Sequence, residues 1–384
     1  MLANKFRLYP NKEQEAKLEF ALDTCRQAYN IMLGELNEQV IIDRAEIQAI
    51  LPDLKICEPK FKEVYSKTLQ YECYRLFSNL SALRVLKGNH RKVGRLRFKG
   101  KGWFKTINYN QSGFSLEDNK IHLSKIGNIK IKAHREVNGN IKQIQIKKEI
   151  DRWYAIIITD EKKQITCGNK IIGIDLGINN YLVDSNGNKI ENPKILEKNL
   201  QKLKHIQKDL SRKKKVSNNR RKARIRLQKF HLKITNQRMD FLHKITTKLV
   251  KECKIIVMED LNIKQMSQQK YFNARNMLDA SWNKFAQLLD FKAESAGCQI
   301  VKVDPRNTTK TCSQCGHIQD MPLWKRTYEC AECNFVIDRD YNSAINILNK
   351  LAGSERTCAE KPVNTLLEQT GSMKQEALTS THVR

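Results

Sequence analysis

The pattern of apolar and polar residues divides the chain into a helical region, a region of short strands and a region that mixes both. Residues 5–9 alternate charged and apolar side chains before a proline and predict a short strand. Apolar residues recur with helical period over 11–33, where Asn11 is a candidate N-cap, and again over 66–87. Residues 11–88 therefore predict a helical unit, compatible with ordinary packed helices and with a helix-turn-helix DNA reader.

The next region is predicted to be a sheet. Short strand patterns with turn residues between them occupy 95–99, 114–116, 120–123, 129–132, 141–146 and 153–158, with turn signals at 118–119, 127–128 and 138–140. This spacing is typical of a barrel or a strongly twisted sheet with one apolar and one basic face. The basic face could be simply exposed to solvent or could contact nucleic-acid phosphates. We expect the strand at 5–9 to pair with this sheet, so that the helical unit is an insertion.

From residue 171 onward, strands and helices alternate. The apolar runs at 171–177, 181–184 and 189–190 predict an antiparallel meander, and strands are also expected at 254–260 and 299–305. Helical periods cover 196–210, 225–249, 282–296 and the stretch from Asp340. This order of elements fits an α/β fold of the ribonuclease H-like type. The tail, residues 354–384, has no clear period and is expected to be disordered.

The net charge indicates a polyanionic partner. The chain of 384 residues has 40% hydrophobic and 29% charged residues, a globular balance, but its Lys and Arg number 70 against 41 acids, a formal net charge of +29. Nucleic acid fits this excess better than an anionic membrane surface. The densest basic run fits a solvated turn, but we favour nucleic-acid contact for Arg212, Lys213, Lys214, Lys215, Arg220, Arg221, Lys222 and Arg224, with the stripe continuing through Arg226, Lys229, Lys233 and Arg238.

The lack of membrane or secretion signals and the use of cysteine both point to an intracellular protein. The sequence has no apolar run of membrane-spanning length and no signal-peptide pattern, so we expect a soluble, cytoplasmic, nucleoid-associated protein, with a monomer favoured. Eleven cysteines in such a chain do not suggest a disulfide framework.

Four cysteines have the spacing of a zinc site. Two CxxC knuckles within residues 305–336 supply four thiolates, the number that completes a tetrahedral shell around Zn²⁺: Cys312, Cys315, Cys330 and Cys333. Gly316 follows the first knuckle, where a turn with positive φ is expected. Free cysteines or a redox pair are the alternatives. We predict a closed structural zinc site in which His317 is a surface residue and not a ligand.

Three acids lie at the ends of predicted core elements. Asp175 is set into an apolar strand, Glu259 ends another strand, and Asp340 begins the last helix. Each alone could be a turn acid, a strand-end acid or a cap, and Asp260 and Asp338 are close neighbours that could be confused with them. Together, in this order, they predict one Mg²⁺ or Mn²⁺ site for phosphodiester chemistry, because two such ions can activate water and stabilise a leaving oxygen.

The motifs GIDLG around Asp175, MEDL around Glu259, the four-cysteine ribbon and DRDYNSAINI around Asp340 resemble those of the TnpB (OrfB) proteins of bacterial insertion sequences, which are relatives of type V CRISPR effectors. The resemblance extends over nearly the whole chain; Ser343, where the family often has alanine, is a mild departure. It implies a wedge barrel (1–10 and 89–168), a helical recognition insertion (11–88), a RuvC nuclease domain (169–304 and 337–353) and a target-binding zinc ribbon (305–336).

The activity that this resemblance implies is RNA-guided cleavage of DNA next to a short flanking motif, with Asp175, Glu259 and Asp340 as the catalytic carboxylates and with a guide RNA and target DNA as partners. Two alternatives remain at this stage: a non-catalytic nucleic-acid-binding regulator of transposition, and a DNA strand-transfer transposase on the same fold. Intact acids favour the nuclease over the regulator.

Overall fold

The computed structural model describes residues 1–39, 43–117, 119–161, 166–262, 266, 274–322 and 324–354. The turn signal at Asp118 lies outside the described residues, as does the predicted disordered tail apart from Ser354, which ends the last helix. By its contacts the chain divides into two compact units, residues 1–163 with 206–230, and residues 164–205 with 231 onward. No helix among the described residues is long and apolar enough to cross a membrane.

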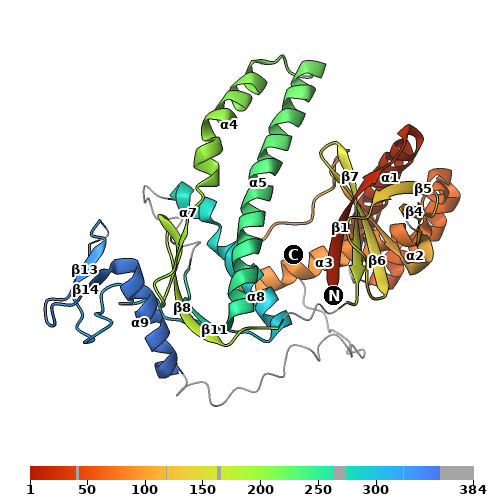
Figure 1. Ribbon diagram of the computed structural model, residues 1–384. Coiled ribbons are helices and arrows are strands. Elements are labelled where there is room, and N and C mark those ends of the chain that lie inside the picture. Colours follow the sequence, from red (N-terminus) through yellow and green to blue (C-terminus); the bar gives the residue numbers. More distant parts are fainter. Residues whose placement is uncertain are drawn as a thin grey trace. The chain divides into compact units, whose positions relative to one another are not determined.

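A seven-stranded antiparallel sheet forms the centre of the first unit (Figure 1). Its strand order is β2-β6-β7-β1-β5-β4-β3, and the bounds are β1 Leu2–Tyr9, β2 Thr106–Asn110, β3 Phe114–Glu117, β4 Lys120–Leu123, β5 Gly127–Lys132, β6 Ile141–Glu149 and β7 Arg152–Thr159. Strand β1 pairs with β7 and β5, as predicted for the strand at residues 5–9. In the described pairing β2 and β3 are edge strands, so the sheet is not closed by hydrogen bonds.

One predicted strand is wrong. Residues 95–99 have no strand structure, and the strand that pairs with β6 is instead β2, which the sequence pattern did not reveal. The backbone of Lys99 forms hydrogen bonds with the side chain of Asn30 in a helix. Asn30 thus satisfies both backbone polar groups of Lys99, which a strand would pair with a neighbouring strand.

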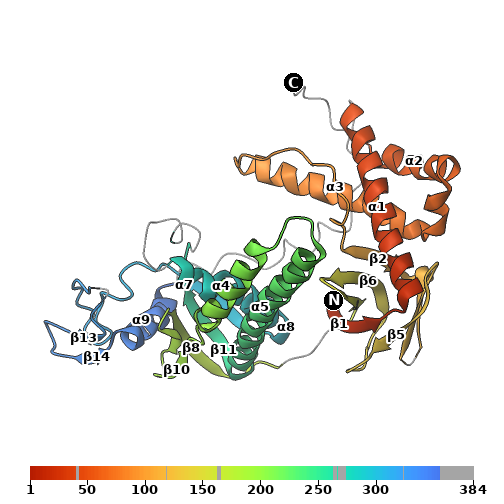
Figure 2. The same cartoon turned by 90° about the horizontal axis from the view of Figure 1, so that it is seen from above.

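The helices of the first unit share a core with the sheet (Figure 2). They are α1 Lys12–Glu38, α2 Arg44–Cys57 and α3 Ser66–Gly88, with short 3-10 turns at Pro59–Glu63 and Gln111–Gly113. Helix α1 begins with a capping box in which Asn11 and Gln14 bond to each other's backbone, as the candidate cap suggested. On the sheet, Phe6, Leu8, Ile129 and Ile131 are buried, while the alternating Lys5, Lys130 and Lys132 are exposed.

The second unit contains a five-stranded sheet with the order β10-β9-β8-β11-β12. Its strands are β8 Lys170–Leu176, β9 Asn180–Asp184, β10 Lys189–Glu191, β11 Cys253–Glu259 and β12 Gln299–Val303. The first three form the predicted antiparallel meander, whereas β11 runs parallel to both β8 and β12. The helices that lie wholly or partly in this unit are α4 Ile195–Arg212, α5 Asn218–Glu252, α7 Ala274–Ala280, α8 Trp282–Ala296 and α9 Arg339–Ser354. Residues 206–230, the end of α4 and the beginning of α5, belong to the first unit.

Each face of this sheet is covered by different helices. Ile172, Ile174, Ile256 and Met258 share a core with residues of α5 and α8, including Leu242, Ile245, Phe285 and Leu289. The alternate residues face the other way, where Val257 and Val303 pack with Ile347 of α9. Gly173 lies on this second face, because a Cβ built there would come within 2.3 Å of the Ala344 carbonyl oxygen and 2.7 Å of the Leu348 nitrogen. Glycine thus permits the backbone of α9 to rest directly on β8.

A small ribbon, whose hairpin consists of β13 Thr327–Glu329 and β14 Val336–Asp338, precedes α9. Two asparagines one turn apart on α9 attach its beginning to the helix. Asn342 donates to the Thr311 carbonyl at 2.8 Å and accepts from the Ser313 N–H at 2.9 Å, and Asn346 donates to the Thr308 and Thr311 carbonyls at 2.9 and 2.6 Å. Because both asparagine side chains are buried, these bonds fix where the ribbon joins the sheet.

Candidate active site

The sheet register brings Asp175 and Glu259 to neighbouring positions. Strand β8 pairs in parallel with β11 so that Gly173 lies opposite Val257 and Ile174 opposite Met258. Asp175 and Glu259 are the next residues of the two strands, and both have the parity of the face that α9 covers. Adjacent strands are about 4.8 Å apart, so this register sets two carboxylates side by side at one edge of the sheet.

Helix α9 adds the third carboxylate. Asp340 lies in the first turn of α9, and only 14% of its side chain is exposed. Asp338 has a different role, because its carboxylate accepts the N–H groups of Asp340 and Tyr341 at 3.0 and 3.1 Å and pairs with Lys189 at 2.7 Å. Asp338 therefore caps the helix, while Asp340 faces the sheet.

The electrostatics show that these acids influence one another. Burial, together with the negative charges of Glu259 and Asp340, raises the pKa of Asp175 to about 8. Burial also raises the pKa of Glu259, although the hydroxyl of Thr308 donates to its Oε1 at 2.6 Å and acts in the opposite direction. Asp340 is partly neutralised by Arg339 at 3.3 Å and Arg326 at 3.7 Å. A concentrated negative charge of this kind suits a divalent cation with oxygen ligands.

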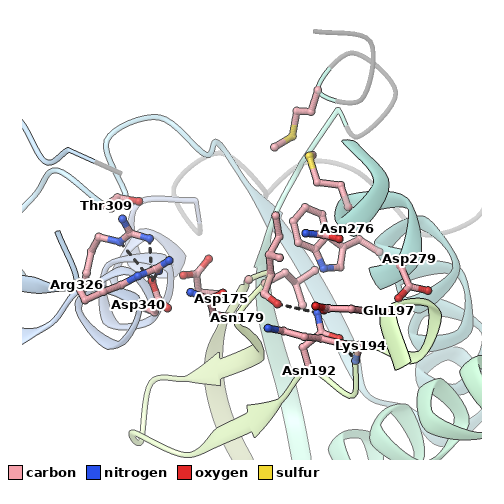
Figure 3. A pocket seen from close by; sticks show the side chains of 17 residues that line it. Asp175, Asn179, Asn192, Lys194, Glu197, Asn276, Asp279, Thr309, Arg326 and Asp340 are labelled. Carbon is pink, nitrogen blue, oxygen red and sulfur yellow. Dashed lines mark hydrogen bonds and ion pairs between the residues drawn. The ribbon is translucent and has the colours of Figure 1, made fainter. Parts of the chain in front are cut away.

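A pocket of about 620 Å³ opens beside the cluster. Figure 3 shows Asp175, Asp340 and Arg326 at one end of it, and Asn192, Glu197 and Asp279 at the other. Glu259 is not part of the lining; its carboxylate is bonded to Thr308 instead. Within the described part of the chain, the three carboxylates do not form a group whose oxygens all lie within 4.8 Å of one another.

The four predicted cysteines do form such a group, with all sulfur atoms within 4.8 Å of one another. The Sγ atoms of Cys312 and Cys333 are 3.7 Å apart, and those of Cys315 and Cys330 are 3.5 Å apart. Zn–S bonds of about 2.3 Å in a tetrahedron require S–S distances of about 3.8 Å, so the residues present fit zinc. Backbone N–H groups, first that of Cys333, lower the pKa of the Cys330 thiol to about 6. Against the opposing backbone N–H groups of His317 and Phe335, hydrogen bonds with the other thiols raise the pKa of Cys315 and Cys333.

The surroundings of this group agree with the sequence expectations. Gly316 adopts a φ of +80°, the positive value predicted for the knuckle turn. The ring of His317 lies 3.9 Å from the carboxylate of Glu332 and is not part of the ligand group.

The basic run lies at the turn between α4 and α5, and only some of its side chains are free to contact nucleic acid. Arg212, Lys214, Lys215, Arg221, Lys222 and Arg224 are exposed. Arg220 instead donates to the carbonyls of Leu210 and Lys213 at 3.0 and 3.1 Å and so caps the end of α4, and Lys213 pairs with Asp209 at 3.1 Å. Further along the predicted stripe, Arg238 pairs with the poorly exposed Asp279. This ion pair makes Arg238 less available to phosphates; that Arg238 continues a phosphate-binding stripe stays a prediction.

Sequence reasoning missed the polar residues that surround the acids. Thr308 and Arg326 come from the segment between β12 and β14, and nothing in their spacing marks them as neighbours of Glu259 and Asp340. Arg339 could have been noticed, because it separates Asp338 and Asp340 in the sequence.

Comparison with solved structures defines the class of fold. A Cas12f1 protein, solved in a "Cas12f1-sgRNA-target DNA complex", matches 89% of this chain and 83% of its own with a TM-score of 0.54 at 16% sequence identity. The chain thus has an α/β fold shared with a Cas12 effector. A family model described as "Cas12f1-like, TNB domain" matches residues 282–347, which include all four cysteines.

Sequence comparison identifies the family. A model described as "Probable transposase" (OrfB of the IS605 type) matches residues 154–270. A Streptomyces pristinaespiralis protein named "Putative RNA-guided DNA endonuclease" is 31% identical over 90% of this chain and 88% of its own length. InsQ of Escherichia coli K12, which carries the same description, is 30% identical over 90% of this chain and 91% of its own. The chain belongs to the TnpB (OrfB) family.

A third family model, described as "Helix-turn-helix domain", matches residues 1–40. In the structure this range contains the strand β1 and the single 27-residue helix α1. Its described residues do not form a helix-turn-helix.

Proposed function

We propose that this protein is an RNA-guided DNA endonuclease of a transposon that hydrolyses the phosphodiester backbone of target DNA matched to a guide RNA. The observation that carries the proposal is the carboxylate cluster: Asp175 and Glu259 end adjacent parallel strands on one face, and Asp340 begins the helix that covers this face. The names of the Streptomyces and E. coli relatives support the same activity. The strand order and the covering helix support a ribonuclease H-like (RuvC) nuclease domain over 169–304 and 337–353.

The acids would act by holding divalent metal. Mg²⁺ or Mn²⁺ bound by Asp175, Glu259 and Asp340 would supply water activation and stabilisation of the leaving oxygen. Thr308 orients Glu259 through its 2.6 Å hydrogen bond, and Arg339 and Arg326 compensate the charge of Asp340. The four cysteines would hold structural zinc, and the asparagines of α9 tie the beginning of this ribbon to the helix that carries Asp340.

Guide RNA and target DNA are the proposed partners. The exposed cations of the α4–α5 turn and the basic face of the first sheet would contact phosphates, while base pairing with the guide selects the target. The first unit would then contain the wedge (1–10 and 89–168) and the recognition insertion (11–88), and residues 305–336 the target-binding ribbon.

The test is cleavage by the full chain purified with its co-purifying RNA. That RNA would be sequenced, and DNA matched to it, with randomised flanking bases, would be supplied with Mg²⁺. Loss of a residue that only hydrogen-bonds to a metal ligand typically costs about 10–100-fold in activity. Asp175→Asn or Glu259→Gln, which alters a ligand itself, should therefore lower the cleavage rate by more than about 100-fold while binding persists.

Asp260→Asn is the matched control, since Asp260 is the exposed acid directly after Glu259. It should cleave at the rate of the unmodified protein. Failure to cut any matched DNA would overturn the proposal. Joining of DNA ends by the protein alone would instead indicate a strand-transfer transposase, the activity that the family-model description "Probable transposase" favours.

A further inference from the structure

Residues 84–105 of the first unit combine exposed cations with exposed aromatic rings. They include the end of α3 and the loop that leads to β2, and the sequence has no Asp or Glu from Cys73 to Leu116. The side chain of Phe98 is 61% exposed and that of Trp103 is 71% exposed. The cations of this segment are Arg84, Lys87, Arg91, Lys92, Arg95, Arg97, Lys99, Lys101 and Lys105.

The loop is held in place at two points, so the rings are presented on a fixed backbone. The Lys99 N–H donates to Asn30 Oδ1 at 2.8 Å, and the Lys99 carbonyl accepts from Asn30 at 3.0 Å and from Arg26 at 3.1 Å. Phe104 is buried, with its ring 5.7 Å from that of Tyr29. Between these anchors Trp103 extends into solvent, with the Lys99 ammonium 5.7 Å from its ring centroid.

Before the rings, the same loop runs beside α3 (Figure 2). Residues of this loop line a cleft of about 710 Å³. Leucines of α1 and α3 line the cleft together with Arg84, Arg91 and Arg95. None of these three arginines forms an ion pair with a described residue. Their positive charge is therefore not neutralised within the part of the chain that the structure describes.

We propose that residues 91–103 of this segment, here called the 91–103 platform, bind unpaired nucleotides, with bases stacked on Trp103 and Phe98 and phosphates on the cations between and before them. The inference deepens the proposed function, on which it rests, by assigning a place for single-stranded nucleic acid. In a duplex the faces of the bases are hidden in the stack, so exposed rings beside cations favour unpaired bases over duplex. Aromatic side chains among cations are the arrangement that stacks single-stranded bases.

Tryptophan fluorescence tests the platform directly. The chain has four tryptophans; Trp153 and Trp282 are 2% and 4% exposed, and Trp324 is 81% exposed. In full-length protein carrying Trp324→Phe, the accessible emission therefore comes from Trp103. The probes are a ten-nucleotide single-stranded RNA, the single-stranded DNA of the same sequence, the corresponding duplexes, and inorganic polyphosphate. We expect the single strands to quench this emission and the duplexes and polyphosphate not to.

Affinity measurements add a second readout. Trp103→Ala should weaken single-strand binding about five- to hundredfold without changing its salt dependence, because stacking releases no counterions. Trp103→Tyr should retain most of the affinity, and Arg97→Gln should lower the salt slope by about 1. Phe20→Ala is the matched control: Phe20 is a partly exposed ring on α1 next to Glu19, and its removal should leave binding unchanged. The relative quenching by RNA and by DNA indicates which strand occupies the platform.

Equal affinity of the Trp103→Ala variant and the unmodified protein, or equal quenching by polyphosphate, would overturn the platform. This result is distinguishable from failure of the proposed function. A protein that never cleaves but whose Trp103 is quenched retains the platform and loses the nuclease. If the Trp103→Ala variant cleaves normally, and single strands do not quench Trp103 in the Trp324→Phe protein, the nuclease is retained and the platform is lost.

Discussion

Glu72 of α3 gives a quantitative prediction about the first unit. Its side chain is fully buried, and neither carboxylate oxygen has a hydrogen-bond partner among the described residues. Arg75 Nη1 lies 3.1 Å from Oε2, close enough for an ion pair but without hydrogen-bond geometry. Burial raises the pKa of Glu72 from 4.5 to about 8, against the opposing influence of Arg75. The folded protein therefore favours the protonated carboxyl.

The pKa of Glu72 is higher in the folded protein than in the unfolded chain, and this difference sets the sign of the pH effect on stability. Below pH 4.5 the carboxyl is protonated in both states, so the folded state bears no penalty; between 4.5 and about 8 the unfolded chain ionises first, and stability falls as pH rises. One pH unit corresponds to about 1.4 kcal/mol, so the loss across this window has an upper limit of about 5 kcal/mol. Relaxation around the ion pair with Arg75 makes the actual loss smaller.

The substitution Glu72→Gln keeps the shape of the side chain and removes its ionisation. Arg75 retains a 3.0 Å hydrogen bond to the Thr106 hydroxyl, so it keeps a partner in the variant. Urea unfolding followed by circular dichroism at pH 5 and pH 8 should show that the unmodified protein loses more stability on this pH change than the variant does. Comparing the two changes cancels the contributions of all other titrating groups.

Glu46→Gln, which alters an exposed glutamate of α2, should leave the pH dependence unchanged. If Glu72→Gln shows the same loss between pH 5 and pH 8 as the unmodified protein, the carboxyl does not titrate in this window and the reasoning is refuted. If, in addition, Glu72→Gln is less stable than the unmodified protein by the same amount at both pH values, the carboxylate is charged at both, and its attraction to Arg75 outweighs the cost of burying the charge.

Two further predictions concern the second unit. In Gly173→Ala the new Cβ would lie 2.3 Å from the Ala344 carbonyl oxygen, so α9 must move away from β8. We expect thermal or urea unfolding to show a free energy of unfolding lower by about 1–3 kcal/mol, and cleavage to be slower. Unchanged stability would contradict the close packing of α9 on β8. Metal analysis should find one zinc per chain, and this zinc should be lost in Cys315→Ser. Protein stripped of zinc, freed of the chelator and assayed with added Mg²⁺ should have a lower melting temperature and cleave more slowly, because the segment that the zinc would stabilise includes Arg326 and follows Thr308. Full activity without zinc would contradict this link.

The sequence by itself determined the features that depend on local spacing. Two CxxC knuckles predict a four-sulfur group, because each knuckle is a single turn that presents two thiolates and the two lie close together in the sequence. Helical period located α1, α3, α4, α5 and α8, and alternation located most of the first sheet. The strand β2 and the helices α2 and α7 were missed. Residues 95–99 alternate like a strand but form none, and the backbone of Lys99 bonds to side chains of α1.

Only the tertiary structure decided how distant residues meet. Asp175 and Glu259 share a face because β8 and β11 pair in parallel in one register; a shift by one residue would turn one carboxylate to the opposite face. The partners of the acids, Thr308 and Arg326, depend on how the ribbon folds back onto α9, and Arg238 is made less available to phosphates by its ion pair with Asp279. Such contacts join residues far apart in the chain, and local periodicity contains no information about them.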